Sequence, residues 1–228
     1  MRIMRAVGAV WVAGALVAGA PGGALAQDHA HHHQAHPALP DGWMAHFDGA
    51  AGHAGHGADD GLSFEAMEPG WHITTGPSGI FYRHEFRAEG TYVLEAEIRL
   101  FDPGARRESF GLFFGGSTLH DPEEQRYTYF ITRRDGHYMI RNREGTGVSD
   151  VQGWTEHEAI PTWDGRPEGA DAVPYLLRVE VGADEVVFRI NGVEVDRRRR
   201  DGLALDGHFG LRVNHGLNLH VVGVDVTR

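Results

Sequence analysis

Residues 92–100 have the sequence Tyr-Val-Leu-Glu-Ala-Glu-Ile-Arg-Leu, in which an apolar side chain recurs at every second position. Successive side chains of an extended chain point to opposite faces, so these apolar residues share one face. The other face carries Glu95, Glu97 and Arg99. This alternation predicts a β-strand with one buried face and one solvent face. The same alternation is found in residues 177–181 and 186–190.

Two dipeptides, Asn191-Gly192 and Asp135-Gly136, mark hairpin turns between segments of this kind. Both tolerate the positive φ angles that tight two-residue hairpin turns require. Many short strands, Gly-rich turns and no amphipathic helix indicate an all-β antiparallel sandwich. The expected strands are residues 43–47, 79–86, 92–100, 109–115, 126–133, 137–143, 177–181, 186–190, 193–197, 207–213 and 219–227.

The composition excludes several classes of function. The 228 residues include no cysteine, which rules out disulfides, thiolate chemistry and c-type haem attachment. The formal net charge is −11, so the chain has no basic surplus with which to neutralise phosphates, and we expect no nucleic-acid partner. No apolar run reaches the ~20 residues that span a bilayer, so we expect no transmembrane segment.

The N-terminus has the order of a secretory signal peptide. Arg2 and Arg5 precede a short apolar stretch, and the triplet Ala24-Leu25-Ala26 provides a small-x-small cleavage site. We therefore expect the protein to be exported, and so periplasmic or secreted. The expected organisation is a signal peptide (1–26), a disordered His-rich tail (27–40) and a β-sandwich domain (41–228).

The C-terminal half resembles the closing strands of concanavalin A-like (laminin-G-like) jelly rolls. In those strands an apolar-x-apolar-Asn-Gly hairpin precedes a Gly-x-apolar-Gly-apolar strand, and Phe188-Arg-Ile-Asn-Gly and Gly207-His-Phe-Gly-Leu match this order. The resemblance covers residues 71–228 and is nearest to the DUF1080 group, which is named for 3-keto-disaccharide hydrolase activity. It implies a concanavalin A-like β-sandwich and, for that group, a glycoside hydrolase. The Glu-x-Asp-x-x-Glu motif of family-16 glucanases does not occur in this sequence.

Three residues are candidates for acid–base chemistry: Glu95, Glu97 and His157. Carboxylates two residues apart on a strand lie roughly 7 Å apart. Glycosidase pairs need about 5–5.5 Å or about 6.5–9.5 Å, so the spacing permits the chemistry. The alternative interpretation is the charged solvent face of an ordinary strand.

The hairpin around Asp135-Gly136 supplies most of the candidate ligand-binding residues. With a two-residue turn, Phe130 faces Arg141 across the hairpin, and Arg143 extends the same face. Arginine offers planar, bidentate donors to sugar hydroxyls and to carboxylates. The opposite face, which we expect in the core, carries Tyr127, Tyr129, Ile131, Tyr138 and Ile140.

A glycan site is expected where these residues converge with Glu95 and Glu97 on one sheet face, with His157 at the rim. Trp154 can either stay exposed and stack on a sugar ring or plug the edge of the sandwich. Alternatively, the arginines pair with the two glutamates as a structural network. The full set of candidate ligand-binding residues is Arg99, Phe130, Arg141, Arg143 and Trp154.

Histidine is concentrated near the N-terminus, and neutral imidazole is a ligand for zinc, copper and nickel. A divalent transition metal in the tail is therefore a candidate cofactor, with a solvated low-complexity tail as the alternative. A structural calcium held by Asp48, Asp206 and Asp225 is a second candidate. The candidate transition-metal ligands are His29, His31, His32, His33 and His36.

Three functions remain open from the sequence. The first is an exported module that binds a glycan or small saccharide, or that recognises a surface. The second is a DUF1080-like glycoside hydrolase, and the third is a periplasmic metal-binding protein that acts through the His-rich tail. The missing family-16 motif favours the first over the second.

Overall fold

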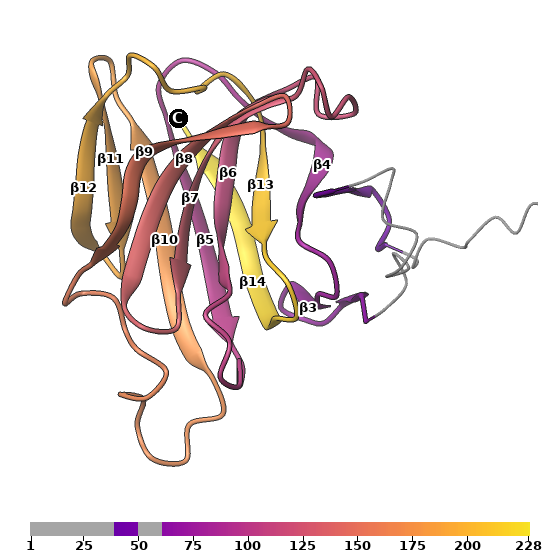
Figure 1. Cartoon of the computed structure of the whole chain (residues 1–228), viewed down its shortest axis with the longest axis vertical. Coiled ribbons are helices and arrows are strands. Elements are labelled where there is room, and N and C mark those ends of the chain that lie inside the picture. The colour runs from indigo at the N-terminus through magenta and orange to yellow at the C-terminus, as the bar shows by residue number, and fades with distance from the viewer. Residues whose placement is uncertain (1–38, 50–60) are drawn as a thin grey trace, which may run out of the picture. The chain divides into compact units, whose positions relative to one another are not determined.

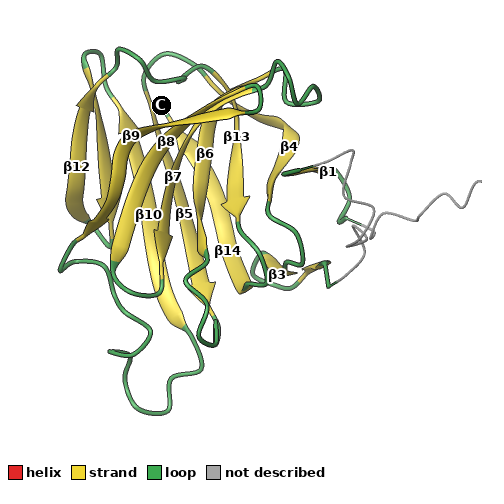
Figure 2. Ribbon diagram, in the orientation of Figure 1, coloured by secondary structure: helices red, strands yellow, loops and turns green. Residues whose placement is uncertain are grey.

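The computed structural model describes residues 39–49 and 61–228, and these residues form fourteen β-strands in two antiparallel seven-stranded sheets (Figure 1). The expected all-β sandwich is therefore confirmed. The signal peptide and the five candidate metal ligands of the tail lie outside the described residues. Within the described ranges, no helix is long and apolar enough to cross a membrane (Figure 2).

The order of strands in space differs from their order in the sequence. Sheet A consists of β1 (Trp43–Phe47), β4 (Gly79–Ala88), β13 (Gly207–Val213), β6 (Ser109–Ser117), β7 (Arg126–Arg133), β8 (His137–Glu144) and β9 (Gly147–Glu156). Sheet B consists of β12 (Val193–Arg199), β11 (Glu185–Ile190), β10 (Val173–Val181), β5 (Tyr92–Leu100), β14 (Asn218–Thr227), β3 (Trp71–Thr74) and β2 (Ser63–Ala66). Each sheet thus combines strands from both ends of the described chain.

The core lies between the inner faces of the two sheets. The alternation in β5 is confirmed, because its apolar side chains, such as Leu94, are fully buried in this core. Phe110 of sheet A meets Tyr175 of sheet B with ring centroids 5.1 Å apart, and Phe130 meets Phe188 at the same distance. Aromatic pairs at such distances contribute about 0.5–1.5 kcal/mol beyond the burial of their area.

The Asn191-Gly192 hairpin is confirmed as a two-residue turn. Ile190 pairs directly with Val193, and the two turn residues have φ angles of 51° and 81°. Positive φ at both central positions is the requirement that selects Asn-Gly in such turns. This turn therefore fixes the register between β11 and β12, and a bulge follows further along the pair.

The hairpin between β7 and β8 differs from the expectation by one residue. Arg133 pairs with His137, which leaves a three-residue loop, Arg134-Asp135-Gly136, with Gly136 at a φ angle of 78°. Three-residue loops with a glycine in this conformation are a common alternative to two-residue turns. A shift of one residue gives every residue of the pair a new cross-strand partner. Because side chains alternate with a period of two, the residues of one strand then face the opposite side relative to the other strand.

The corrected register reverses the expected roles of the two faces of β7. Phe130 pairs with Ile140 rather than Arg141, and it is fully buried in the core between the sheets. Tyr129 pairs with Arg141, on the face of sheet A that is turned away from sheet B. The prediction that Phe130 lies on a binding face is therefore wrong. The tyrosines of β7 are buried, as predicted, but in a second cluster on the outer face of sheet A and not in the core between the sheets. Paired residues of neighbouring strands point to the same face, so Phe130 faces the core together with its partner Ile140.

Three strands were not predicted: β2, β3 and β9. β2 and β3 have only four residues each, too few to show a clear period. β9 has ten residues, but none of its side chains is fully buried. Because β9 is the edge strand of sheet A, its sequence lacks the buried face that alternation reveals.

Candidate ligand-binding face

The outer face of sheet A, which is the face turned away from sheet B, carries a second cluster of large side chains. Tyr82, Tyr127 and Tyr129 belong to it, and their exposed fractions are only 5%, 2% and 6%. They come from β4 and β7, where alternate residues point into the main core. Buried aromatic rings therefore form the base of the outer face of sheet A. The remaining buried members of the cluster are Ile80, Phe113, Leu119, Ile131 and Met139.

A buried arginine with a half-exposed carboxylate partner lies beside these rings. Arg212 of β13 donates to both carboxylate oxygens of Asp48, and one of the two bonds measures 3.0 Å. Arg212 is 8% exposed, and its guanidinium carbon lies 5.6 Å from the centre of the Tyr129 ring. A charge buried to this extent needs such a partner, because desolvation costs several kcal/mol per ion. The sequence signal was available, since Arg212 alternates with the core residues Leu211 and Val213.

The Tyr127 hydroxyl lies within this charged surrounding. Burial raises the pKa of Tyr127 to about 12, and the neighbouring Asp48 adds to the rise while Arg212 and Arg143 oppose it. The phenol therefore stays protonated at neutral pH. It remains a hydrogen-bond donor and acceptor rather than an anion.

Arg141 and Arg143 extend the outer face of sheet A along β8. They pair across the strands with Tyr129 and Tyr127. Arg141 forms an ion pair with Asp150 of β9. Arg143 instead donates from Nε to the carbonyl oxygen of Gly145 at 2.7 Å. Both predicted arginines thus lie on one face, which they share with the tyrosines of β7.

Trp154 lies on the same face, at the end nearer the Arg134–Gly136 loop. The guanidinium carbon of Arg133 lies 4.3 Å from the centre of its ring, a cation–π contact. Trp154 is 37% exposed, whereas Trp163 is 6% exposed and belongs to the core. Of the two outcomes open for Trp154, the structure shows the exposed ring, and Trp163 is the tryptophan that packs into the sandwich.

His157 lies just after β9 and is tied into the loop that covers the β7–β8 turn. Its main-chain N–H donates to the carbonyl of Gly136 at 3.0 Å, and its Nδ1 accepts from the N–H of Ala159 at 3.2 Å. The imidazole therefore stabilises a local turn. It has no carboxylate partner among the residues that the structure describes.

Several histidines outside the set of candidate metal ligands surround Tyr82. His46 Nε2 and the Tyr82 hydroxyl are 3.2 Å apart, and the ring of His208 lies 5.3 Å from that of Tyr82. Burial, and then the charge of His120, lower the pKa of His46. Tyr82, His120 and His208 also line a pocket of about 260 Å³ next to this cluster of buried aromatic side chains. These residues come from distant strands and loops, so no local spacing marks them.

The predicted convergence of the two candidate sets is wrong, because they lie on opposite sheets. Glu95, Glu97 and Arg99 belong to β5 and face outward from sheet B. Glu95 accepts from Arg178 at 3.0 Å, and Glu97 accepts from Arg99 at 3.1 Å. The predicted network between the glutamates and the β8 arginines is wrong for the same reason.

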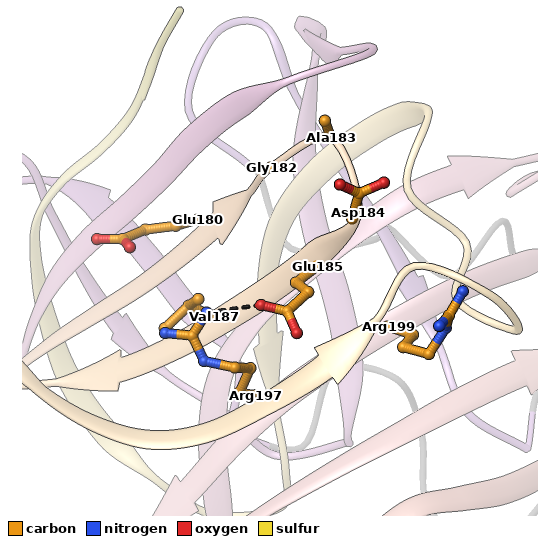
Figure 3. Close-up of a pocket in the computed structure, with 8 residues that line it drawn as sticks. All are labelled: Glu180, Gly182, Ala183, Asp184, Glu185, Val187, Arg197 and Arg199. Carbon is orange, nitrogen blue, oxygen red and sulfur yellow. Dashed lines mark hydrogen bonds and ion pairs between the residues drawn. The ribbon is translucent and has the colours of Figure 1, made fainter.

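The outer face of sheet B is a network of ion pairs. Arg178 and Arg189 both bond to Glu180, at 2.8 and 3.1 Å. Arg197 bonds to Glu185 at 2.8 Å, as Figure 3 shows. A hollow of about 600 Å³ lies over this network, lined by charged side chains and by the β10–β11 turn. Because its charges already neutralise one another, this face has the character of a solvated surface.

The candidate calcium ligands do not come together. Asp48 is engaged by Arg212, Asp206 accepts from the main chain of Gly90, and Asp225 faces outward from sheet B opposite Glu95. Within residues 39–49 and 61–228, no group of three or more His, Asp or Glu side chains is placed to hold a metal ion. The predicted calcium site is therefore wrong for this arrangement.

Comparison with known proteins supports the fold. No protein-family model matches the sequence, and no curated protein is similar enough to count as a relative. Among solved structures, the carbohydrate-binding module CBM66 from Bacillus subtilis superposes with a TM-score of 0.56 at 13% identity, covering 82% of this chain and 96% of its own. A Bacteroides ovatus family-16 glycoside hydrolase in complex with a product gives a TM-score of 0.55 at 10% identity, covering 81% and 94%.

A third structure, a Bacillus subtilis protein of unknown function with a galectin-like fold, gives a TM-score of 0.54 at 14% identity, covering 81% of this chain and 88% of its own. Together with the two seven-stranded sheets, these similarities confirm the concanavalin A-like jelly roll. The nearer relationship to the DUF1080 group stays a prediction.

Proposed function

We propose that this protein is a glycan-binding module whose ligand lies on the outer face of sheet A. The observation that carries the proposal is the combination on that face of an exposed tryptophan, buried tyrosine rings and an arginine, Arg143, without a carboxylate partner in the described part of the chain. Saccharides need an aromatic plane for the C–H face of the ring and planar donors for their hydroxyls. The carbohydrate-binding module and the glucan hydrolase among the similar structures support this assignment by analogy of fold.

The length of the face favours an oligosaccharide over a single sugar. Along β8 the outward residues run from His137, beside Arg133 and Trp154, to Arg143. Six residues of strand span about 20 Å at ~3.4 Å per residue. A ligand that contacts both Trp154 and Arg143 must therefore extend over several sugar rings.

Binding is favoured over hydrolysis because, in the described part of the chain, the carboxylates beside Arg141 and Arg212 are not free to act as acid or base. Asp48 and Asp150 are both bonded to arginines. Glu95 and Glu97, the predicted catalytic pair, lie on the other sheet and are bonded to arginines too. The DUF1080-like hydrolase remains the alternative proposal, and turnover of a 3-keto-disaccharide by the purified protein would favour it.

Trp154→Ala is expected to weaken binding of an oligosaccharide, selected on a glycan array, by roughly 30-fold in a calorimetric titration. An aromatic anchor of a binding surface typically contributes about 2 kcal/mol. Val193→Ala is a matched control, because Val193 is an exposed apolar residue of sheet B. Equal binding by Trp154→Ala and the parent would place the site elsewhere, and an array without any bound glycan would contradict the proposed function.

Export is the second part of the proposal, and it is supported by the signal-peptide pattern of residues 1–26. The mature protein is expected to begin at Gln27. Mass spectrometry of the protein from a periplasmic or culture-supernatant fraction measures its N-terminus directly. Recovery of the chain only in the cytoplasmic fraction, with residues 1–26 retained, would contradict export.

A further inference from the structure

The arginines on the two outer faces of the sandwich differ in how many carboxylates they contact. On sheet B, each of three arginines contacts two carboxylates: Arg178 contacts Glu95 and Glu180, Arg189 contacts Glu180 and Glu194, and Arg197 contacts Glu185 and Glu194. Their charge is therefore balanced within the protein. On the outer face of sheet A, Arg141 and Arg212 have one carboxylate each, Asp150 and Asp48.

Arg143 is the exception on the outer face of sheet A. Its one hydrogen bond within the described part of the chain runs from Nε to the carbonyl of Gly145, and no carboxylate there forms an ion pair with it. A guanidinium has five N–H donors, so most of those of Arg143 remain without a protein acceptor in residues 39–49 and 61–228. Together, Arg141, Arg143 and Arg212 with Asp48 and Asp150 carry a net charge of +1, in a chain whose formal net charge is −11.

The orientation of the Arg143 side chain is fixed by its neighbours in a way that suits a ligand. The bond to Gly145 fixes the plane of the guanidinium, and Gly145 has a φ angle of 56° in the tight turn that follows β8. Arg143 is half-buried and lies opposite Tyr127 across the strands, where its charge acts on the Tyr127 phenol. A partly desolvated guanidinium with a fixed plane is suited to a carboxylate, which it can bind through two parallel hydrogen bonds.

We propose that the saccharide bound by this face is acidic, with a uronic-acid carboxylate taken by Arg143 while Trp154 stacks on another ring of the same chain. This inference rests on the proposed function and specifies its ligand class. The positive centre is local, because the net charge of the whole chain is strongly negative and would repel an anion in general. Recognition of a carboxylate therefore depends on Arg143 and not on the overall field.

The test compares tetrasaccharides of galacturonate, mannuronate and glucuronate with their methyl esters, which keep the shape and remove the charge. At least one free acid is expected to bind at least about tenfold more tightly than its ester. Raising the salt concentration should reduce this preference, because salt screens the interaction of exposed charges. Arg143→Gln should abolish the preference while ester binding persists.

Arg126→Gln is the control, since Arg126 is an exposed arginine of the neighbouring strand β7 that pairs with Glu144. It should leave the acid–ester preference unchanged. Equal binding of acid and ester in all three pairs, or a preference that survives Arg143→Gln, would overturn the inference and leave glycan binding intact. Absence of binding to these six compounds and to the neutral glycans of the array would instead overturn the proposed function itself.

Discussion

Asp48→Ala is expected to lower the free energy of unfolding by about 3 kcal/mol or more. The substitution leaves the buried guanidinium of Arg212 without its carboxylate, and leaving a buried charge without its partner typically costs about 3–5 kcal/mol. Because the Asp48 side chain is itself 33% exposed, we expect a value at the lower end of this range. The side chain of Arg212 is only 10% exposed, so water cannot replace the lost partner easily. Chemical denaturation followed by tryptophan fluorescence measures the change, and Trp43 and Trp163 are buried reporters of the folded state.

Asp150→Ala is the matched control, because Asp150 pairs with an arginine on the same face but both partners are more exposed. Surface pairs contribute only about 0–1 kcal/mol, so this variant should remain close to the parent. Removing both charges with Asp48→Ala and Arg212→Met should restore part of the lost stability. Equal effects of Asp48→Ala and Asp150→Ala would contradict the importance of burial for the Arg212–Asp48 pair.

Phe130→Ala is expected to destabilise the fold by about 3–5 kcal/mol. Phe130 is fully buried, its ring packs 5.1 Å from Phe188 of the opposite sheet, and truncation would leave a cavity between the sheets. Val148→Ala, at an exposed apolar site of β9, should change stability by less than about 0.5 kcal/mol. A small effect of Phe130→Ala in the same denaturation experiment would mean that this ring faces outward, as the two-residue turn predicted.

Strands with one buried face and one solvent-exposed face could be predicted from their alternating sequence. β5 has the predicted bounds, because its alternation of apolar and polar residues reports burial directly. β7 and β13 also have the predicted bounds, although both of their faces are largely buried. The Asn191-Gly192 turn was predictable because both of its φ angles are positive and few dipeptides allow that. β9 was missed for the opposite reason, since an edge strand without a buried face leaves no periodic signal.

The length of the β7–β8 turn could not be predicted from its own residues. Asp135-Gly136 suits either a two-residue turn or the end of a three-residue loop. A segment about 30 residues further along the chain contacts the longer loop. The N–H of Trp163 donates to the carbonyl of Arg134 at 2.8 Å, and Asp135 forms an isolated bridge with Thr162. Such contacts depend on the fold as a whole, and the local sequence does not contain them.

The candidate site was predictable in its chemistry and not in its location. Arg141, Arg143 and Trp154 do share one face, but their partners are Tyr127, Tyr129 and the Arg212–Asp48 pair rather than the glutamates of β5. Asp48 and Arg212 are 164 residues apart in the sequence. Which strands become neighbours is decided by packing over the whole chain, so no local pattern could assign β5 and β8 to different sheets.

The three-residue turn also restricts how this protein can vary. Surface turns usually tolerate insertions and deletions, because little depends on their length. Here the main chain of the loop has partners of its own, because the N–H of Trp163 donates to the carbonyl of Arg134 and Asp135 forms a bridge with Thr162. The loss of one residue between Arg133 and His137 would remove these contacts from the segment that packs over the turn. We expect homologues to keep this turn at a fixed length, with glycine at its third position. Gaps in related sequences should therefore fall in other loops, and the count of residues here should be as constant as the identity of a core residue.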